Sequence, residues 1–353
     1  MTLSAITTPA ELQDYLHAAM QLEHATIPPY LTALYSLQPG SNSDAYHVIR
    51  VVVVEEMLHL TLAANLLNAV GGEPDLSRKG FVARYPAYLP DGETDFQVSL
   101  QPFSPEAIDT FLSIERPAAA PTAEHRFVRR HRKAVTIPAV APNGDDGLHF
   151  YSIGEFYAEI ERGIRHLHAQ GVDLFVGDPA RQVTPELYYS GGGEVIPVKD
   201  LDSAVAAVRL ISEQGEGLEG GIYDEEDELS HYYRFQQLRL GRYYQPGDAP
   251  NEPTGPALEV AWDAVYPVAT NLRVADLPEG SEVRAAAETF NTTYADFLAL
   301  LTRAFTGQPE LLVPAVGGMF GLRDAVTRLV RNPVPGRPGV HAAPTFEMPV
   351  DAR

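Results

Sequence analysis

Glu56 and His59 form a Glu-x-x-His pattern, and these residue types at this spacing can bind a metal ion. Side chains at positions i and i+3 leave one face of a helix about one turn apart. Glu23 offers a second carboxylate, 17 residues before Gly40, while Glu56 lies 16 residues after Gly40. Because a helix rises about 1.5 Å per residue, two antiparallel helices that turn near Gly40 would hold both carboxylates at nearly the same height.

One Glu from one helix and Glu-x-x-His from the next make half of the ligand set of a carboxylate-bridged di-metal bundle. The same pattern on a solvated helix face would carry no function. However, it lies within apolar sequence, with valines at 51–54 before it and a mostly apolar run at 60–64 after it. A helix that is apolar on almost all sides is buried, and a buried carboxylate needs a partner. The sequence therefore favours a metal site.

Later helices would supply the second half of such a set. Glu155 lies near the start of an expected helix over about 151–170, and Glu213 lies near the end of another over about 202–214. If these two helices pack antiparallel, their carboxylates also meet at one level. His231 ends a second Glu-x-x-His pattern.

Three carboxylates compete for the place beside His231. Glu228 completes the literal pattern, but it follows an acidic run at 225–227 of the kind that helix N-termini favour. We therefore favour Glu213 together with His231, and we expect Glu216 to be an additional or substitute ligand. The choice among the three stays open.

Capping signals indicate the helices that position the first ligands. Thr8 is a candidate N-cap, followed by Pro9 and by Glu11 as the acid of a capping box. This helix would run to the prolines at 28–29, which remove backbone donors, so we expect a kink after Glu23. The next helix would run from about 44 to 70 and end at the Gly-Gly pair 71–72.

The whole pattern predicts a predominantly all-α fold. A four-helix bundle would occupy residues 1–250, with irregular insertions at about 73–147 and 171–200, and a C-terminal helical extension would occupy 251–353. Further expected elements are a short helix at 105–114, helices at 257–275, 281–306 and 309–330, and an extended Pro-rich tail from 332 on the surface or a neighbouring subunit. The C-terminal helices would serve core packing or an oligomer contact, with a homodimer as one option.

Composition narrows the function classes. The chain has 353 residues and a net charge of −21, which argues against nucleic acid and anionic membranes as partners. It has no cysteine, so a metal site must use His, carboxylates and water, which suits iron or manganese. No signal-peptide pattern or transmembrane-length run is visible, so a cytoplasmic protein is expected. The basic patch at 125–133 is interpreted as a solvated face that pairs with acidic neighbours; the alternative is an anchor for a substrate carboxylate or phosphate.

Several segments together resemble the ferritin-like domain of the iminophenyl-pyruvate dimer synthase family. The segments are residues 21–35, 55–72, 153–157, 213–217 and 230–235. The resemblance covers roughly residues 10–245. It implies a ferritin-like four-helix core whose metal ligands are Glu23, Glu56, His59, Glu155, a Glu of the Glu213 and Glu216 pair, and His231. The family's named synthases act on imines derived from aromatic amino acids and are much longer chains, so the dimerisation reaction is not carried over.

Three functions follow in order of preference. The first is a non-haem di-metal oxidoreductase with two irons, or with manganese, acting on a small amino-acid-derived molecule in secondary metabolism. The second is an iron-binding or ferroxidase-type protein without an organic substrate, which the irregular insertions disfavour as a storage cage. The third is a metal-free helical scaffold. Four tyrosines are candidates for contacts to the second imidazole nitrogens or to substrate: Tyr30, Tyr157, Tyr232 and Tyr233.

Overall fold

The protein was analysed as a computed structural model that describes residues 6–90, 96–117, 150, 152–188, 191–218, 221–224 and 227–349. Its elements are eight α-helices and four short 3-10 helices within these ranges. The β-pairing of this described part consists of isolated bridges. The predicted predominantly helical fold is thus confirmed. The basic patch at 125–133 lies outside the described residues.

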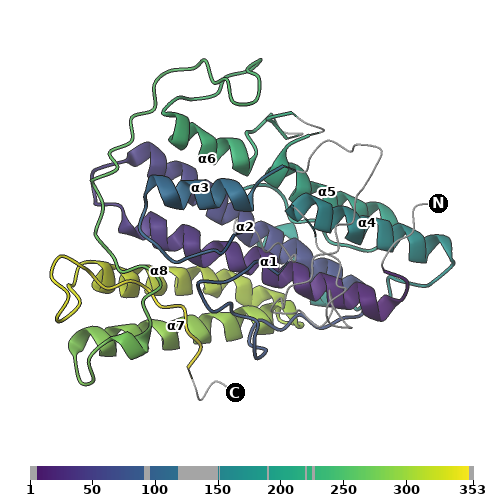
Figure 1. Cartoon of the computed structure of the whole chain (residues 1–353). Helices are drawn as coiled ribbons and strands as arrows, with labels where there is room; N and C mark the ends of the chain where they lie inside the picture. The colour runs from purple at the N-terminus through teal and green to yellow at the C-terminus, as the bar shows by residue number, and fades with distance from the viewer. Residues whose placement is uncertain are drawn as a thin grey trace.

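Two long helices form the centre of the molecule (Figure 1). Helix α1 spans Pro9–Ser36 and α2 spans Ser43–Ala69, and they pack along each other as an antiparallel pair. The predicted capping box is present: the Thr8 hydroxyl oxygen accepts from the Glu11 N–H, and the Glu11 carboxylate accepts from the Thr8 N–H. After α2 the chain turns at Gly71, whose φ of +74° is a left-handed conformation that glycine adopts easily.

Helix α1 continues through Pro28 and Pro29 to Ser36, beyond the end that the sequence predicted. Pro29 has no N–H to donate to the carbonyl of Ala25, one turn earlier. The hydroxyl of Tyr85 takes that role and donates to the Ala25 carbonyl oxygen at 2.7 Å. A side chain from outside the helix therefore compensates for one missing backbone bond and lets the helix pass the prolines.

The other two positions of the bundle are each filled by two shorter helices. Helices α3, Pro105–Ile114, and α4, Ile153–Ala169, have 10 and 17 residues. Helices α5, Leu201–Glu216, and α6, His231–Leu240, have 16 and 10 residues. Because α3 packs on α6 and α4 packs on α5, the four pieces make two interrupted helices alongside α1 and α2, as Figure 1 shows. Both interruptions lie near the middle of the bundle.

A third layer covers the opposite face of the α1–α2 pair (Figure 1). Helices α7, Glu282–Phe305, and α8, Leu312–Val330, form a hairpin that contacts α2 and α1. Their buried apolar side chains are continuous with those of the bundle. The helices expected at 281–306 and 309–330 are confirmed, and the division of the chain near residue 250 stays a prediction.

The prediction of a helix over 257–275 is wrong. This segment is irregular and contains turns at 262–264 and 270–271, before the 3-10 turn η3, Val274–Asp276. Its backbone groups bond to the end of α1 instead: the Tyr266 N–H donates to the Ser36 carbonyl at 2.7 Å, and Gln38 N–H donates to the Ala264 carbonyl at 3.1 Å. The last carbonyls of a helix lack partners inside the helix, and Pro267 disfavours helical geometry at the residue before it.

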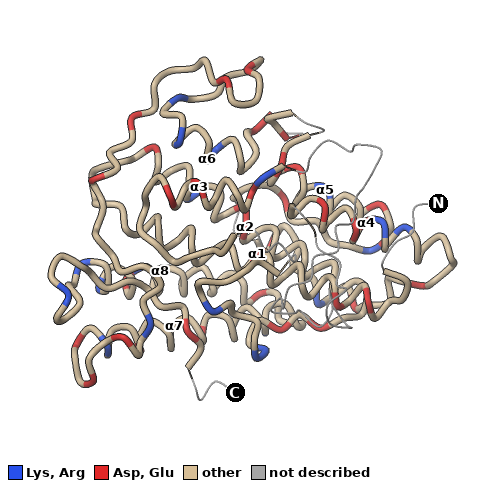
Figure 2. The backbone as a smooth tube through the Cα atoms, in the orientation of Figure 1, with Lys and Arg blue, Asp and Glu red and all other residues tan. Residues whose placement is uncertain are grey.

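The Pro-rich tail has turns and is mostly exposed over 332–339, in keeping with the predicted surface position. Over 342–349 it is extended as predicted, but it packs within this chain. Ala342 and Ala343 are fully buried, and Phe346 is 4% exposed. The 3-10 turns η1, Pro179–Arg181, η2, Pro185–Leu187, and η4, Pro309–Leu311, lie in the connections. None of the described helices is long and apolar enough to cross a membrane. Figure 2 shows Asp and Glu positions on the outer helices and on the loops, in keeping with the acidic composition.

Candidate metal centre

Five buried side chains converge where the shorter helices are interrupted. Glu23 comes from α1, Glu56 and His59 come from α2, Glu115 follows the last residue of α3, and His231 is the first residue of α6. None of the five is more than 3% exposed. Isolated charges at such depth are strongly unfavourable, so these groups must neutralise one another or bind a cation.

The two histidines have matching surroundings. His59 Nδ1 lies 3.4 Å from Glu23 Oε2, and His231 Nδ1 lies 3.5 Å from Glu115 Oε2. Glu56 lies between them, with Oε2 at 3.9 Å from His59 Nδ1 and Oε1 at 3.0 Å from His231 Nδ1. The two rings are stacked with centroids 5.3 Å apart. The arrangement is therefore two similar half-sites that share one carboxylate.

In the cluster, several carboxylates crowd around the imidazole of His231. Burial and the nearby carboxylates of Glu115 and Glu23 raise the pKa of Glu56 well above its usual value, although the adjacent His231 ring acts in the opposite direction. Burial alone would lower the pKa of His231, but Glu115, Glu55 and Glu56 surround its ring and raise the pKa well above the usual value. Both shifts favour the protonated forms of Glu56 and His231, which offset the negative charge of the crowded carboxylates.

The donor set fits a metal ion. Glu56, His59 and His231 each offer one ligand atom within 4.8 Å of the others. His231 Nδ1 makes no hydrogen bond although it is fully buried and faces two carboxylates. A buried nitrogen in that situation has its lone pair or proton directed at the centre of the cluster. Oxygen and imidazole ligands without thiolate suit iron or manganese.

Hydroxyl groups hold the carboxylates in place. Tyr157 donates to Glu23 Oε1 at 2.5 Å, and Tyr30 donates to Glu115 Oε1 at 2.5 Å. In both cases the second carboxylate oxygen is the one that lies near an imidazole. Burial and the adjacent carboxylates raise the pKa of both tyrosines well above the usual value, so they remain donors. Tyr30 and Tyr157, which the sequence offers as candidates for contacts to the imidazoles or to substrate, contact the carboxylates.

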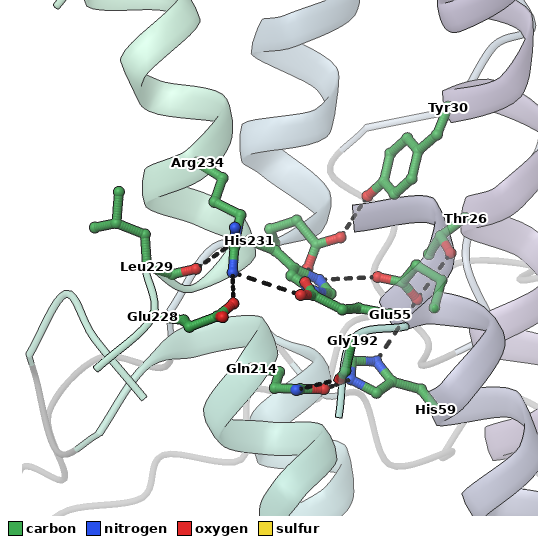
Figure 3. Close-up of polar contacts among 12 residues, drawn as sticks. Thr26, Tyr30, Glu55, His59, Gly192, Gln214, Glu228, Leu229, His231 and Arg234 are labelled. Carbon is green, nitrogen blue, oxygen red and sulfur yellow. Dashed lines mark hydrogen bonds and ion pairs between the residues drawn. The ribbon is translucent and has the colours of Figure 1, made fainter. Parts of the chain in front are cut away.

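The outer nitrogens of the imidazoles are also bound (Figure 3). His59 Nε2 lies 2.9 Å from Gln214 Oε1, and the Gln214 amide donates to the Gly192 carbonyl at 2.7 Å. Because the amide nitrogen is used there, the amide oxygen accepts from His59 Nε2–H. His231 Nε2 lies 2.9 Å from Glu55 Oε2. Both rings thus direct Nδ1 toward the carboxylates, and such outer contacts orient metal ligands.

Arg234 completes the His231 side of the site. Its guanidinium lies 3.4 Å from Glu55 Oε1 and 2.5 Å from Glu228 Oε2 (Figure 3). Burial by itself would raise the pKa of Glu55, but the hydrogen bond from His231 and the charges of His231 and Arg234 lower it. Glu228 has a side chain that is 55% exposed, so its partner is this arginine and solvent rather than the buried cluster.

Three predicted ligands occupy other positions. Glu155 is in the first turn of α4, and Glu213 and Glu216 are in the last turn of α5, all partly exposed. Glu216 Oε1 accepts the Gly154 N–H at 2.7 Å and so caps the start of α4. The group of ligand atoms within 4.8 Å of one another, formed from described residues, consists of Glu56, His59 and His231, so it includes none of the three and neither Glu23 nor Glu115. Their role as metal ligands stays a prediction.

Sequence reasoning missed Glu115, Glu55 and Gln214. A signal for Glu115 exists, because Ile108, Phe111 and Glu115 follow one another at helical spacing and the first two are fully buried. An acid at the end of such an apolar stripe points into the core. Glu55 and Gln214 each stand next to a predicted ligand, and the sequence does not indicate which neighbour faces inward.

Comparisons with known proteins agree with the fold. The family model described as ferritin-like matches residues 16–240. A crystal structure of a ferritin-like protein from Caulobacter vibrioides superposes with a TM-score of 0.58 at 25% identity, covering 91% of this chain and 95% of that one.

Two curated proteins are similar in sequence. Dichlorochromopyrrolate synthase from Lentzea aerocolonigenes is 25% identical over 334 residues, which is 84% of this chain and 29% of that protein. The 2-imino-3-(indol-3-yl)propanoate dimerase from Chromobacterium violaceum is 27% identical over 392 residues, 99% of this chain and 35% of that protein. This chain therefore spans about a third of the length of these relatives.

Proposed function

This chain belongs to the ferritin-like family, and from that premise we propose that it is a non-haem di-metal oxidoreductase, with iron as the metal, that acts on a small amino-acid-derived molecule. The observation that carries the proposal is the convergence of three buried carboxylates and two imidazoles. Glu23 and His59 would hold one ion, Glu115 and His231 would hold the other, and Glu56 would be shared.

Bound iron would supply one-electron and oxygen chemistry that side chains cannot perform, in a chain that has no cysteine. The chain's own residues prepare the site for it. Gln214 and Glu55 fix the orientation of the imidazoles, and Tyr30 and Tyr157 fix one oxygen of each outer carboxylate. Burial keeps bulk water away from the five central side chains.

The substrate class rests on the relatives. Their names describe a synthase of dichlorochromopyrrolate and a dimerase of an indolyl imino acid, which supports an amino-acid-derived organic substrate. Because this chain spans only about a third of those proteins, the proposal takes over the class of substrate and not either reaction.

Metal analysis of the protein purified without chelator tests the proposal. We expect about two irons per chain, and we expect loss of metal in Glu56→Ala and in His59→Ala with the helical circular dichroism spectrum retained. Glu115→Gln should lower the metal content if the cluster described above binds the metal. Glu216→Gln at the end of α5 is the matched control, and it should lower the metal content only if the set predicted from the sequence binds the metal. Full metal occupancy in Glu56→Ala would overturn the site.

A further inference from the structure

A large apolar cavity lies on the face of the α1–α2 pair that is turned away from the metal centre. Its volume is about 440 Å³, and its walls come from α1, α2, α7 and α8, together with Tyr188, Gly191 and Gly192. Cavities of about 300 to 1,000 Å³ are the size that binds small organic molecules. The alternation is visible along α1, where Glu23 faces the metal centre and His24 faces the cavity.

The lining is rich in aromatic rings. Tyr35 and Tyr188 contribute from the bundle side, and Phe290, Phe297 and Phe305 contribute from α7. Rings of this kind pack edge-to-face or offset against another aromatic ring, and such pairs add stabilisation beyond the apolar area that they bury. The walls therefore favour a flat aromatic body over water or a polar metabolite.

Two arginines give the cavity a positive end. Arg50 on α2 and Arg323 on α8 both line it and both are exposed. Tyr35 lines the same cavity. Burial raises its pKa to about 12, with a further contribution from Tyr46, while Arg323 and Arg50 act in the opposite direction. Among the residues that the structure describes, neither guanidinium has an ion-pair partner.

Arg50 and Arg323 lie at one cavity in a chain with a net charge of −21, where carboxylates outnumber cationic side chains. A guanidinium offers donors in a planar fork that matches a carboxylate. We infer that this cavity binds a small aromatic carboxylate, with the ring system among the aromatic side chains and the carboxylate between Arg50 and Arg323. The site is distinct from the metal centre and shares none of its five central residues.

The two sites approach each other at one loop. Gly192 lines the cavity, and its carbonyl accepts the amide of Gln214, which in turn holds His59. A Cβ on Gly192 would lie 2.4 Å from Glu55 Cγ, and Gly192 has a φ of +73°. The loop is therefore held tightly against α2 at this point, and the helix itself separates the cavity from the cluster.

Isothermal titration with 2-naphthylacetate tests the inference on the full chain. We expect saturable binding at one site, at least tenfold weaker binding of the neutral 2-naphthylacetamide, and about tenfold weaker binding of 2-naphthylacetate by Arg50→Gln and by Arg323→Gln. Arg328→Gln, an exposed arginine on the same helix that does not line the cavity, is the matched control and should bind normally.

A second variant tests the location. Ala315→Phe, at a buried wall position, should abolish binding with both arginines intact. If that variant does not fold, Val316→Trp at a partly exposed position of the same wall replaces it. Glu56→Ala should bind the probe as the unmodified chain does, because the metal centre is separate.

Four results would overturn the inference. They are no binding of 2-naphthylacetate at millimolar concentration, equal binding of the acid and the amide, binding that survives the wall substitution, and loss of binding in folded Glu56→Ala. Tighter binding of decanoate than of 2-naphthylacetate would overturn the aromatic part and assign the cavity to aliphatic acids.

Discussion

Each outer carboxylate of the metal centre is fixed through one oxygen, which leaves the other directed at an imidazole. Tyr157 holds Glu23 in this way, and Tyr30 holds Glu115. A carboxylate that is free to rotate would lose more conformational entropy on binding an ion. If the centre binds metal as proposed, the two hydroxyls would act on metal affinity by positioning the carboxylates.

We expect Tyr157→Phe and Tyr30→Phe each to weaken metal binding about tenfold, because removal of such outer contacts has effects of that order. Competition with a fluorescent chelator measures the change. Tyr294→Phe is the control, since its hydroxyl makes a buried contact of similar length to His24, at 2.5 Å, outside the centre. Equal affinity in all four proteins would show that the hydroxyls serve packing alone.

Metal binding is expected to release protons. The pKa values of Glu56 and His231 are both raised, so both groups hold their protons to a higher pH than they would in water, and a bound cation must displace those protons. Affinity should therefore rise as pH rises through neutrality and fall as pH is lowered. Titration calorimetry at pH 7 in two buffers of different ionisation enthalpy counts the protons, and identical heats in both buffers would contradict this prediction.

At the scale of elements, the centre depends on where helices stop. Glu115 and His231 reach the cluster because α3 ends and α6 begins at the level of Glu23 and Glu56.

The connection from Gly171 to Gly177 packs against the end of α2, where the Gly177 N–H donates to the Ala69 carbonyl at 3.0 Å.

We expect Gly177→Ala to destabilise the protein by about 2 kcal/mol or more. A Cβ at Gly177 would lie 1.7 Å from the carbonyl oxygen of Asn68, so backbone must move. Thermal unfolding followed by circular dichroism measures the effect. The matched change Gly321→Ala on α8 meets no atom within 4 Å and should raise stability by up to about 1 kcal/mol. Similar melting temperatures for both variants would contradict the close approach.

Sequence patterns predicted the uninterrupted helices well and the interrupted ones only as separate pieces. The capping box at Thr8 and the Gly-Gly pair after α2 are local signals, and local signals place Glu23, Glu56 and His59. Glu115 was missed because α3 and α4, the two parts of one interrupted helix, are separated by a long connection. Spacing along the chain therefore does not indicate the height of Glu115 in the bundle. The helix predicted at 257–275 failed for a related reason, since tertiary bonds to the end of α1 outweigh a weak helical pattern.

At the scale of the whole molecule, the end of the Pro-rich tail packs against the C-terminal layer. Phe346 is 4% exposed and packs edge-on against Phe290 and Tyr294, with ring centroids 5.0 and 5.1 Å apart. The Thr345 hydroxyl donates to Asn291 at 2.9 Å, and the Val274 N–H donates to Glu347 at 2.8 Å. The tail is thus part of the core over α7.

We expect Phe346→Ala to cost about 3 to 5 kcal/mol of unfolding free energy, as removal of a buried aromatic side chain does. Chemical denaturation provides the measurement. Phe320→Ala on α8, where the side chain is 62% exposed, should change stability by less than about 0.5 kcal/mol. Comparable losses in the two variants would mean that the tail does not pack as described.

The two interrupted positions of the bundle also affect how such proteins can diversify. Chain that leaves the bundle after α3 or α5 returns at the same level, so the connection can change in length without altering the register of any ligand-bearing turn. Connecting segments are the parts of a fold that tolerate insertion best and most often carry function. The connections at the two interruptions could therefore change in length or sequence, and a new specificity could be acquired there, while α1 and α2 stay unchanged.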